Sequence, residues 1–209
     1  MYSSPTESMP SRARGNAFLW LIAAVVVAAI AVPWHTHNSL TGKDESVSSA
    51  WANVQSNLQR RADLIPNLLR TVSQAMEYES ETLEALVEQQ AELLARHQQP
   101  PADEAALNHI AEVDRQLSVS TQHLLARTAV LPELKATDQF LQLQAQLEGT
   151  ENRINVARIR YNEAARDYNS AIRGFIGRYV AESLGMTPRP YFEASDDAGQ
   201  PVEVVFGND

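Results

Sequence analysis

The sequence contains no cysteine. Disulfide bonds, thiolate catalysis, cysteine metal sites and lipid attachment to a cysteine are therefore excluded, whereas an oxidising compartment remains permitted. Cationic side chains are also scarce, with 17 lysines and arginines against 26 aspartates and glutamates and a net charge of −9. Because nucleic-acid binding depends on cationic contacts to phosphates, we expect no nucleic-acid partner.

The motifs of common catalytic and metal sites are missing as well. The chain has no glycine-rich phosphate loop, no His-Glu-x-x-His, no Gly-x-Ser-x-Gly and no Glu-x-x-His pair, and its five histidines are scattered. We therefore predict that the protein is not an enzyme, that it has no catalytic residues, and that it holds no metal ion and no cofactor.

One long apolar run is present near the N-terminus. Residues 17–34 carry no charge, reach roughly 27 Å as a helix, and have Trp20 and Trp34 near their ends, where indoles favour a membrane interface. We predict a single transmembrane helix there, between a disordered tail over residues 1–16 and a polar linker over residues 35–46. The competing interpretation is a signal peptide that is cleaved after Ala31.

The charges beside this run indicate an orientation. Arg12 and Arg14 lie on its short N-terminal side, which favours a cytoplasmic N-terminus. The rest of the chain would then lie on the outer, periplasmic side of a bacterial inner membrane.

The stretch from Asp138 to Leu184 repeats apolar residues every seven positions, which predicts one long helix of roughly 70 Å packed against others. Gly185 should end this helix, residues 188–192 should be extended, and residues 195–209 should form a disordered acidic tail. The large line comprises Phe140, Leu147, Ile154, Tyr161, Tyr168 and Phe175, and the smaller companion line comprises Leu143, Thr150, Ala157, Ala164 and Ala171.

A second line with the same spacing predicts a helix from Val47 to about Gln98, ended by the prolines at 100 and 101. Asp103 should open a further helix that ends near Thr128. The line comprises Trp51, Leu58, Ile65, Val72, Glu79, Leu86 and Leu93. The predicted fold is all-α: a transmembrane helix followed by an antiparallel up-and-down bundle of three to four long helices over residues 47–194.

Pro66 lies inside the first bundle helix and frees the carbonyl of Ala62, so we expect a kink or a restart there, with Asp63 as the cap. If the chain folds back at its two later turns, the long helix should run antiparallel to the first, with residues 161–169 level with Pro66. Polar residues of both helices would then gather, and these are the candidate partner-binding residues: Arg60, Arg61, Asp63, Asn67, Asn155, Asn162 and Asn169. The alternative is that the arginine and aspartate residues only satisfy the interrupted helix.

Two polar lines remain open in meaning. The asparagines at 155, 162 and 169 recur every seven residues, about 130° from the apolar seam, so we expect them outside the core. Five glutamates align on one face of residues 77–92, either as a solvated face or as a site for a cation or basic partner. They are Glu77, Glu81, Glu84, Glu88 and Glu92.

Several of these residues resemble a known family. The run Gln59-Arg60-Arg61-Ala62-Asp63-Leu64-Ile65-Pro66-Asn67-Leu68 resembles the signature of the LemA family, and so do Glu151-Asn152-Arg153-Ile154, Tyr161-Asn162, Tyr168-Asn169 and Tyr191-Phe192-Glu193 in the same order. The resemblance covers roughly residues 38–194 and implies one N-terminal membrane helix, an up-and-down helical bundle and no established enzymatic activity. Ile176 replaces the proline that usually follows Phe175 in the family, so a straighter helix is expected. The family is usually drawn with its N-terminus outside, against the arginine bias.

The function that we expect from these observations is a membrane-anchored interaction or scaffold protein of the bacterial cell envelope. Its partners would be the lipid bilayer, through residues 17–34, and a second envelope or membrane protein. Two alternatives stay open: a metal-dependent or accessory enzyme component that uses the glutamate line, and a homo-oligomeric scaffold that shapes the membrane.

Overall fold

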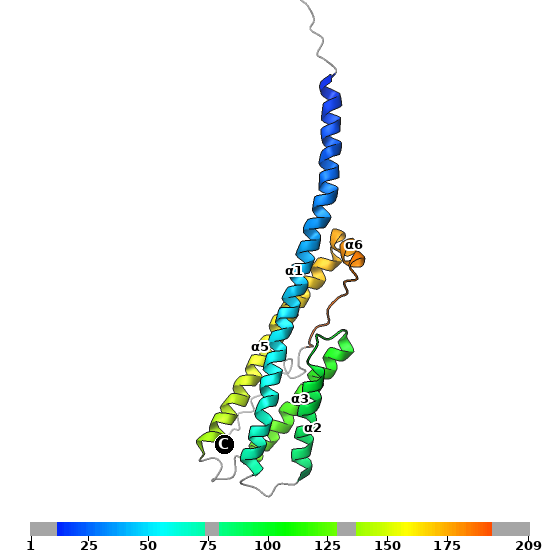
Figure 1. Cartoon of the computed structure of the whole chain (residues 1–209). Helices are drawn as coiled ribbons and strands as arrows, with labels where there is room; N and C mark the ends of the chain where they lie inside the picture. The colour runs from blue at the N-terminus through cyan, green and yellow to red at the C-terminus, as the bar shows by residue number, and fades with distance from the viewer. Residues whose placement is uncertain (1–11, 74–79, 129–136, 194–209) are drawn as a thin grey trace, which may run out of the picture. The chain divides into compact units, whose positions relative to one another are not determined.

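The structure is a computed structural model that describes residues 12–73, 80–128 and 137–193. These residues form helices without any strand, as the sequence predicted (Figure 1). The helices are α1 (Arg12–Ser73), α2 (Ser80–Arg96), α3 (Glu104–Thr128), α5 (Asp138–Arg173) and α6 (Phe175–Ser183). The chain divides into two compact units: the first combines Met1–Gly42 with Ala171–Thr187, and the second combines Lys43–Ser170 with Pro188–Asp209.

The second unit contains the helical bundle. Trp51 and Arg61 of α1 contact Tyr161 and Glu151 of α5 respectively, so these two helices run antiparallel. The chain also reverses between Ser73 and Ser80, and α2 returns along α1 (Figure 1). The prediction of a single helix from Val47 to Gln98 is therefore wrong. With only the two turns expected after Gln98 and after Thr128, the long helix would have run parallel to α1. The additional reversal between Ser73 and Ser80 makes it antiparallel.

The core of the bundle follows the predicted lines, with one shift. Every member of the large line from Phe140 to Tyr168 is buried, but Ala165 is buried in place of Ala164 in the companion line. An α-helix with 3.6 residues per turn drifts by about 20° per seven residues, so over three repeats the seam moves to the next residue. Asp103 caps α3 as predicted, because its Oδ1 accepts the backbone N–H of Ala106 at 2.8 Å.

The N-terminal part of α1 is long and apolar enough to cross a membrane, and every residue from Leu19 to Trp34 is exposed. The helix begins at Arg12, inside the tail that was expected to be disordered, so that expectation is wrong for residues 12–16. Residues 35–46, which were expected to form a linker, are helical and continuous with both sides. The acidic tail over residues 195–209 lies outside the described residues.

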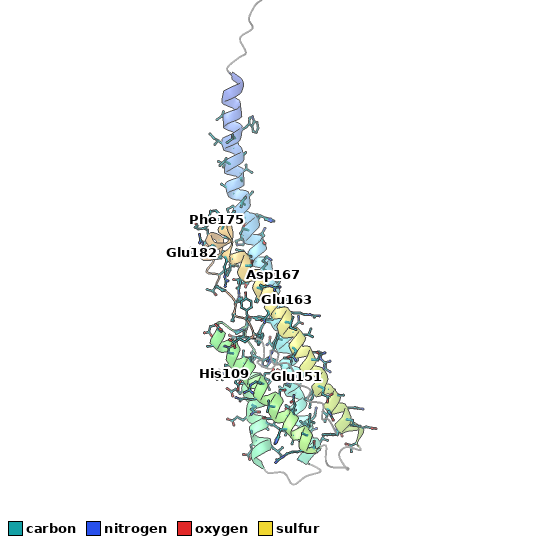
Figure 2. The ribbon with its side chains drawn as sticks, turned by 180° about the vertical axis from the view of Figure 1, so that it is seen from behind. His109, Glu151, Glu163, Asp167, Phe175 and Glu182 are labelled. Carbon is teal, nitrogen blue, oxygen red and sulfur yellow. The ribbon has the colours of Figure 1, made fainter. Side chains whose placement is uncertain are left out.

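The helix predicted from Asp138 to Leu184 is interrupted at Gly174, so the expectation of a straighter helix is wrong. A Cβ atom on Gly177 would lie 2.0 Å from the carbonyl oxygen of Ala171, so only glycine permits this close approach. Phe175 begins α6 and is 80% exposed, and therefore does not continue the buried line (Figure 2). Gly185 ends α6 as predicted, with φ at 65° in a Schellman motif.

Candidate functional site

A buried group of charges lies at the centre of the bundle. Arg61 of α1 is 3% exposed, and its Nη1 lies 2.5 Å from Oδ1 of Asp114 on α3. The second guanidinium nitrogen of Arg61 donates to Glu151 of α5, which also accepts a hydrogen bond from Ser118 at 2.9 Å. Arg158 of α5 donates to the other oxygen of Asp114 at 2.8 Å. Two cations and two anions from three helices thus balance one another in this charge centre.

Burial makes each of the two innermost charges of this centre depend on its partner. Burial raises the pKa of the Asp114 carboxyl, and the guanidinium groups of Arg61 and Arg158 oppose that rise. Arg61 and Asp114 are the two buried members, and removing either of them deprives the other of its buried partner, which costs about 3–5 kcal/mol. The charge centre therefore selects the one arrangement of α1, α3 and α5 in which all four side chains meet.

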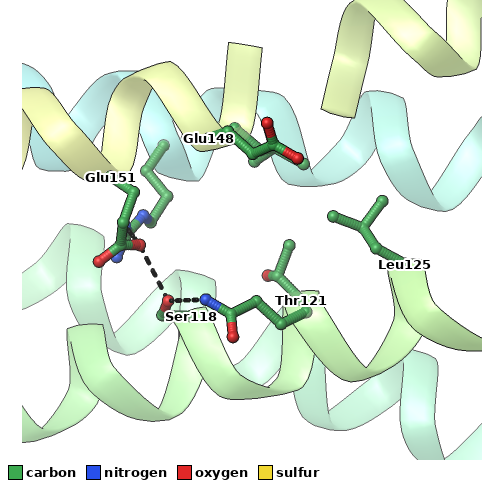
Figure 3. Close-up of a pocket in the computed structure, with 8 residues that line it drawn as sticks. Ser118, Thr121, Leu125, Glu148 and Glu151 are labelled. Atoms are coloured by element: carbon green, nitrogen blue, oxygen red, sulfur yellow. Dashed lines mark hydrogen bonds and ion pairs between the residues drawn. The ribbon is translucent and has the colours of Figure 1, made fainter. Parts of the chain in front are cut away.

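A pocket of about 190 Å³ lies beside the charge centre. Glu148 and Glu151 of α5 face Ser118, Thr121 and Leu125 of α3 across it (Figure 3). Arg61, Gln122 and Leu147 complete the lining. The volume is below the roughly 300–1,000 Å³ of typical small-molecule sites. The carboxylates of Glu151 and Glu148 also already accept hydrogen bonds, from Ser118 and Gln144. Both carboxylates of this pocket therefore already have partners on α3 or α5.

Helix α1 continues through Pro66 without a restart. The carbonyl of Ala62, which a proline four residues later leaves without an amide donor, accepts the side-chain amide of Gln90 on α2 at 2.8 Å. Asp63 accepts from Gln59 at 2.8 Å and does not cap a new helix. The carbonyl of Ala62 therefore has a hydrogen-bond donor, as expected for a buried backbone group, and the donor comes from α2.

Two of the predicted asparagines bind the C-terminal segment. The Asn162 side chain donates to the carbonyl of Phe192 at 2.8 Å and accepts its N–H at 2.9 Å. Asn169 bonds both backbone groups of Arg189 in the same way, at 2.7 and 2.8 Å, and also contacts the Tyr191 hydroxyl. Each side-chain amide thus replaces the partner strand that this extended segment lacks. Asn169 is only 2% exposed, so its expected place outside the core is wrong.

The sequence spacing explains why two asparagines hold one segment. Seven residues of helix between Asn162 and Asn169 rise by roughly 10.5 Å. Three residues of extended chain between Arg189 and Phe192 cover roughly 10 Å. The two repeats match, so both asparagines reach a backbone donor and acceptor at the same time.

The side chain of Phe192 enters an aromatic cluster. Its ring stacks on Trp51 at 6.3 Å and meets the edge of Tyr161 at 5.5 Å, and the Arg158 guanidinium lies 4.9 Å above it. Burial raises the pKa of the Tyr161 hydroxyl to about 12. Arg158 therefore joins the charge centre to the cluster that holds the C-terminal segment.

The candidate residues do not gather as expected. Trp51 lies beside Tyr161 and Arg61 beside Glu151, so residues 161–169 lie roughly 20–35 Å along α5 from the level of Pro66. Only Arg61 joins the charge centre, and only Asn162 and Asn169 hold the C-terminal segment. The other four are exposed: Arg60, Asp63 and Asn67 on α1, and Asn155 on α5.

Sequence reasoning missed Asp114, Glu151, Arg158 and Gln90. One of them had a visible signal, because Asp114 falls on the apolar stripe of α3 between Ile110 and Leu117. A lone acid at such a position calls for a buried cation. Glu151 lies in a motif that resembles the LemA family, but it was not predicted as a site residue, and Gln90 and Arg158 have no comparable local signal.

Of the described glutamates of this line, Glu92 contacts two basic side chains, one on its own helix and one on α3. Glu92 accepts from His109 of α3 at 2.9 Å and from Arg96 at 3.2 Å, and these contacts lower the pKa of Glu92. Glu84 and Glu88 are exposed, whereas the side chains of Glu77 and Glu81 lie outside the description. In the described part of the chain, no three histidines or carboxylates are grouped as metal ligands.

The contacts above join the motifs that the sequence analysis singled out. Arg61 of the first motif pairs with Glu151 of the second, and the two asparagines bind the segment that ends in Tyr191 and Phe192. The LemA family model matches residues 50–206. No curated protein matches the chain. Because the family model spans about three quarters of the 209 residues, the chain belongs to the LemA family.

Proposed function

We propose that this protein is anchored in the bacterial inner membrane by the apolar part of α1, and that its bundle binds a second envelope protein without catalysis of its own. The observation that carries the proposal is the outer face of α5. Val156 and Ile159, three residues apart, are 39% and 59% exposed there. A protein contact would remove the apolar area of these two neighbouring side chains from water, which is favourable.

The outer face of α5 is defined by five exposed residues within about 100° of one another: Asn152, Asn155, Val156, Ile159 and Glu163. Asn155 is the member of the asparagine line that does not reach the C-terminal segment. Glu163, labelled in Figure 2, is about 80° from Asn155 around α5 at 100° per residue. Amide side chains beside aliphatic ones offer both hydrogen bonds and apolar area. We therefore assign partner binding to Asn155 and its neighbours rather than to Asn162 and Asn169.

Photocrosslinking in intact membranes tests this assignment. A photoreactive amino acid at Ile159 should capture one protein, identified by mass spectrometry and by reciprocal capture from that protein. The matched control is Val119 of α3, which is 53% exposed but lies on another helix. Equal capture at Val119 would contradict the proposed face, and an adduct between two copies of this chain would indicate the self-associating scaffold instead.

The orientation of the anchor follows from the arginine bias. With Arg12 and Arg14 on the cytoplasmic side, the bundle would face the periplasm. Protease added to intact spheroplasts should then digest the bundle, while a cytoplasmic marker stays whole. Protection of the bundle would support the opposite orientation. An N-terminus near Val32 in the mature protein would show cleavage and refute the anchor.

A further inference from the structure

Helix α6 turns its large apolar residues outward. Phe175, Ile176 and Tyr179 are 80%, 40% and 58% exposed, and at 100° per residue they share an arc of about 100°. The opposite side consists of the small residues Gly177 and Ala181, which are buried. A helix at the surface of a soluble protein shows the reverse arrangement, with large apolar residues inward.

The backbone holds α6 in this orientation. Gly177 lies so close to the carbonyl of Ala171 that no side chain fits between them. The Schellman motif at Gly185 closes the other end of α6 within the helix itself, through the Met186 N–H to the Ala181 carbonyl at 2.9 Å. Because the contact at Gly177 joins the small face of α6 to the backbone of α5, turning Phe175 and Tyr179 inward would break it.

The first unit places this outward face near the end of the apolar run. Residues 171–187 and the N-terminal part of α1 belong to the same unit, and α6 lies beside α1 (Figure 1). Residues 19–34 are exposed, and Leu40, at 1%, is the first buried residue of α1 from Leu19 onward. From Trp34 to Leu40 the helix rises by roughly 9 Å. The headgroup layer of one leaflet is roughly 5–8 Å thick, so Leu40 lies just beyond its aqueous edge. Helix α6, beside α1, is therefore close enough for its outward side chains to reach this layer (Figure 1).

The side chains around this face suit that layer. The Arg178 guanidinium lies 5.2 Å from the centre of the Tyr179 ring, and Arg173 is exposed just before α6. Tyrosine and arginine both combine an apolar body with a polar end, which favours the boundary between lipid and water. Guanidinium groups also bind the phosphates of lipid headgroups.

We propose that α6 is a second membrane contact, with Phe175, Ile176 and Tyr179 inserted into the headgroup layer. The leaflet concerned is the one on the side of Trp34, where α1 passes from the membrane to the bundle. The proposal rests on the proposed anchor. The partner of this face of α6 is the surface of the lipid bilayer, because the face lies in the same unit as the apolar run of α1. Interfacial helices bury one apolar face to a depth of about 5–10 Å in this manner.

Depth-dependent fluorescence quenching tests the proposal on the full chain. Because the chain has no cysteine, Tyr179→Cys provides a unique thiol for an environment-sensitive fluorophore. The labelled protein is reconstituted into vesicles of phosphatidylethanolamine and phosphatidylglycerol that carry nitroxides near the headgroup or near the bilayer centre. Val26→Cys, within the apolar run, reports the anchor, and Ile159→Cys, on α5 of the second unit, reports an exposed site of the bundle.

The expected result is headgroup-level quenching at position 179 at least about twofold stronger than at position 159, with centre-level quenching strongest at position 26. If Val26→Cys is not quenched, the anchor itself is refuted. If Val26→Cys is quenched but positions 179 and 159 respond equally, only the α6 contact is refuted. A disulfide between two unlabelled Tyr179→Cys chains without lipid quenching would also overturn it, because a second copy would cover the face. Phe175→Cys repeats the measurement if Tyr179→Cys fails to fold.

Discussion

Replacing Asn169 by alanine should release the C-terminal segment from α5. The side chain of Asn169 makes three hydrogen bonds, two to the backbone of Arg189 and one to the Tyr191 hydroxyl. Asn155→Ala is the matched control, because it changes the same residue type on the same helix at an exposed position. Asn169→Ala should therefore destabilise the protein, whereas Asn155→Ala should not.

The magnitude follows from the contacts. Three hydrogen bonds at about 0.5–1.5 kcal/mol each give about 2–3 kcal/mol, since Arg189 is half-buried and water replaces part of what is lost. Alanine is the better helix former and returns up to about 0.7 kcal/mol. Asn169→Ala should thus destabilise the segment by about 2 kcal/mol. Asn155→Ala, which keeps only the helix-propensity gain, should be neutral or slightly stabilising.

Hydrogen exchange of the segment itself is the most direct assay. A loss of about 2 kcal/mol should speed exchange of the Arg189 amide by about 30-fold if this amide exchanges through local release of the segment. Asn162→Ala should speed the Phe192 amide by a smaller factor, because Asn162 makes two hydrogen bonds. Unchanged exchange at Arg189 in Asn169→Ala, or an equal change in Asn155→Ala, would refute the reasoning.

Three further predictions concern the bundle. Asp114→Ala should cost about 3–5 kcal/mol in chemical denaturation, because Arg158 loses its anion and the buried Arg61 keeps only the half-buried Glu151. Glu112→Ala on the same helix, which removes an exposed pair, should barely move the denaturation midpoint, and similar midpoints would contradict the charge centre. Gln90→Ala should cost about 1–3 kcal/mol, because it leaves the carbonyl of Ala62 without a donor. In a Pro66→Ala background the same substitution should cost little, because the restored N–H of residue 66 can bond that carbonyl. Equal costs in both backgrounds would show that Gln90 does not act through this hydrogen bond. The free energy of unfolding should fall between about pH 10 and pH 12, because Tyr161 loses its proton near 10 when unfolded and at about 12 when folded. Tyr161→Phe should flatten that fall, and an unaltered slope would argue against burial as its cause.

Local signals predicted the elements well where one residue decides the local backbone. Asp103 and Gly185 mark helix ends in the structure as they do in the sequence, because a cap depends only on residues within one turn. The break at Gly174 escaped prediction for the opposite reason. Its seven-residue pattern continues through the glycine to Phe175, and only the contact between Gly177 and Ala171 shows that the chain bends there.

The asparagine line shows how one pattern can have two outcomes. Asn155, Asn162 and Asn169 are equivalent on a helical wheel, and the wheel places all three outside the seam. The C-terminal segment covers only the last two, so one of them is buried and one is half-buried, while Asn155 stays exposed. Periodicity predicts the angle of a side chain around its helix but not what lies beside it.

By itself the sequence determined the helical class, the apolar run that is long enough to cross a membrane and most of the buried lines, because these depend on composition, on propensity and on a period of 3.6 residues. Tertiary structure alone decided which residues became neighbours. Arg61 meets Asp114 and Glu151 from 53 and 90 residues away, and the freed carbonyl near Pro66 meets Gln90 only because the chain reverses between Ser73 and Ser80. Local periodicity does not determine the register of one helix against another. The need to pair buried charges and backbone groups does.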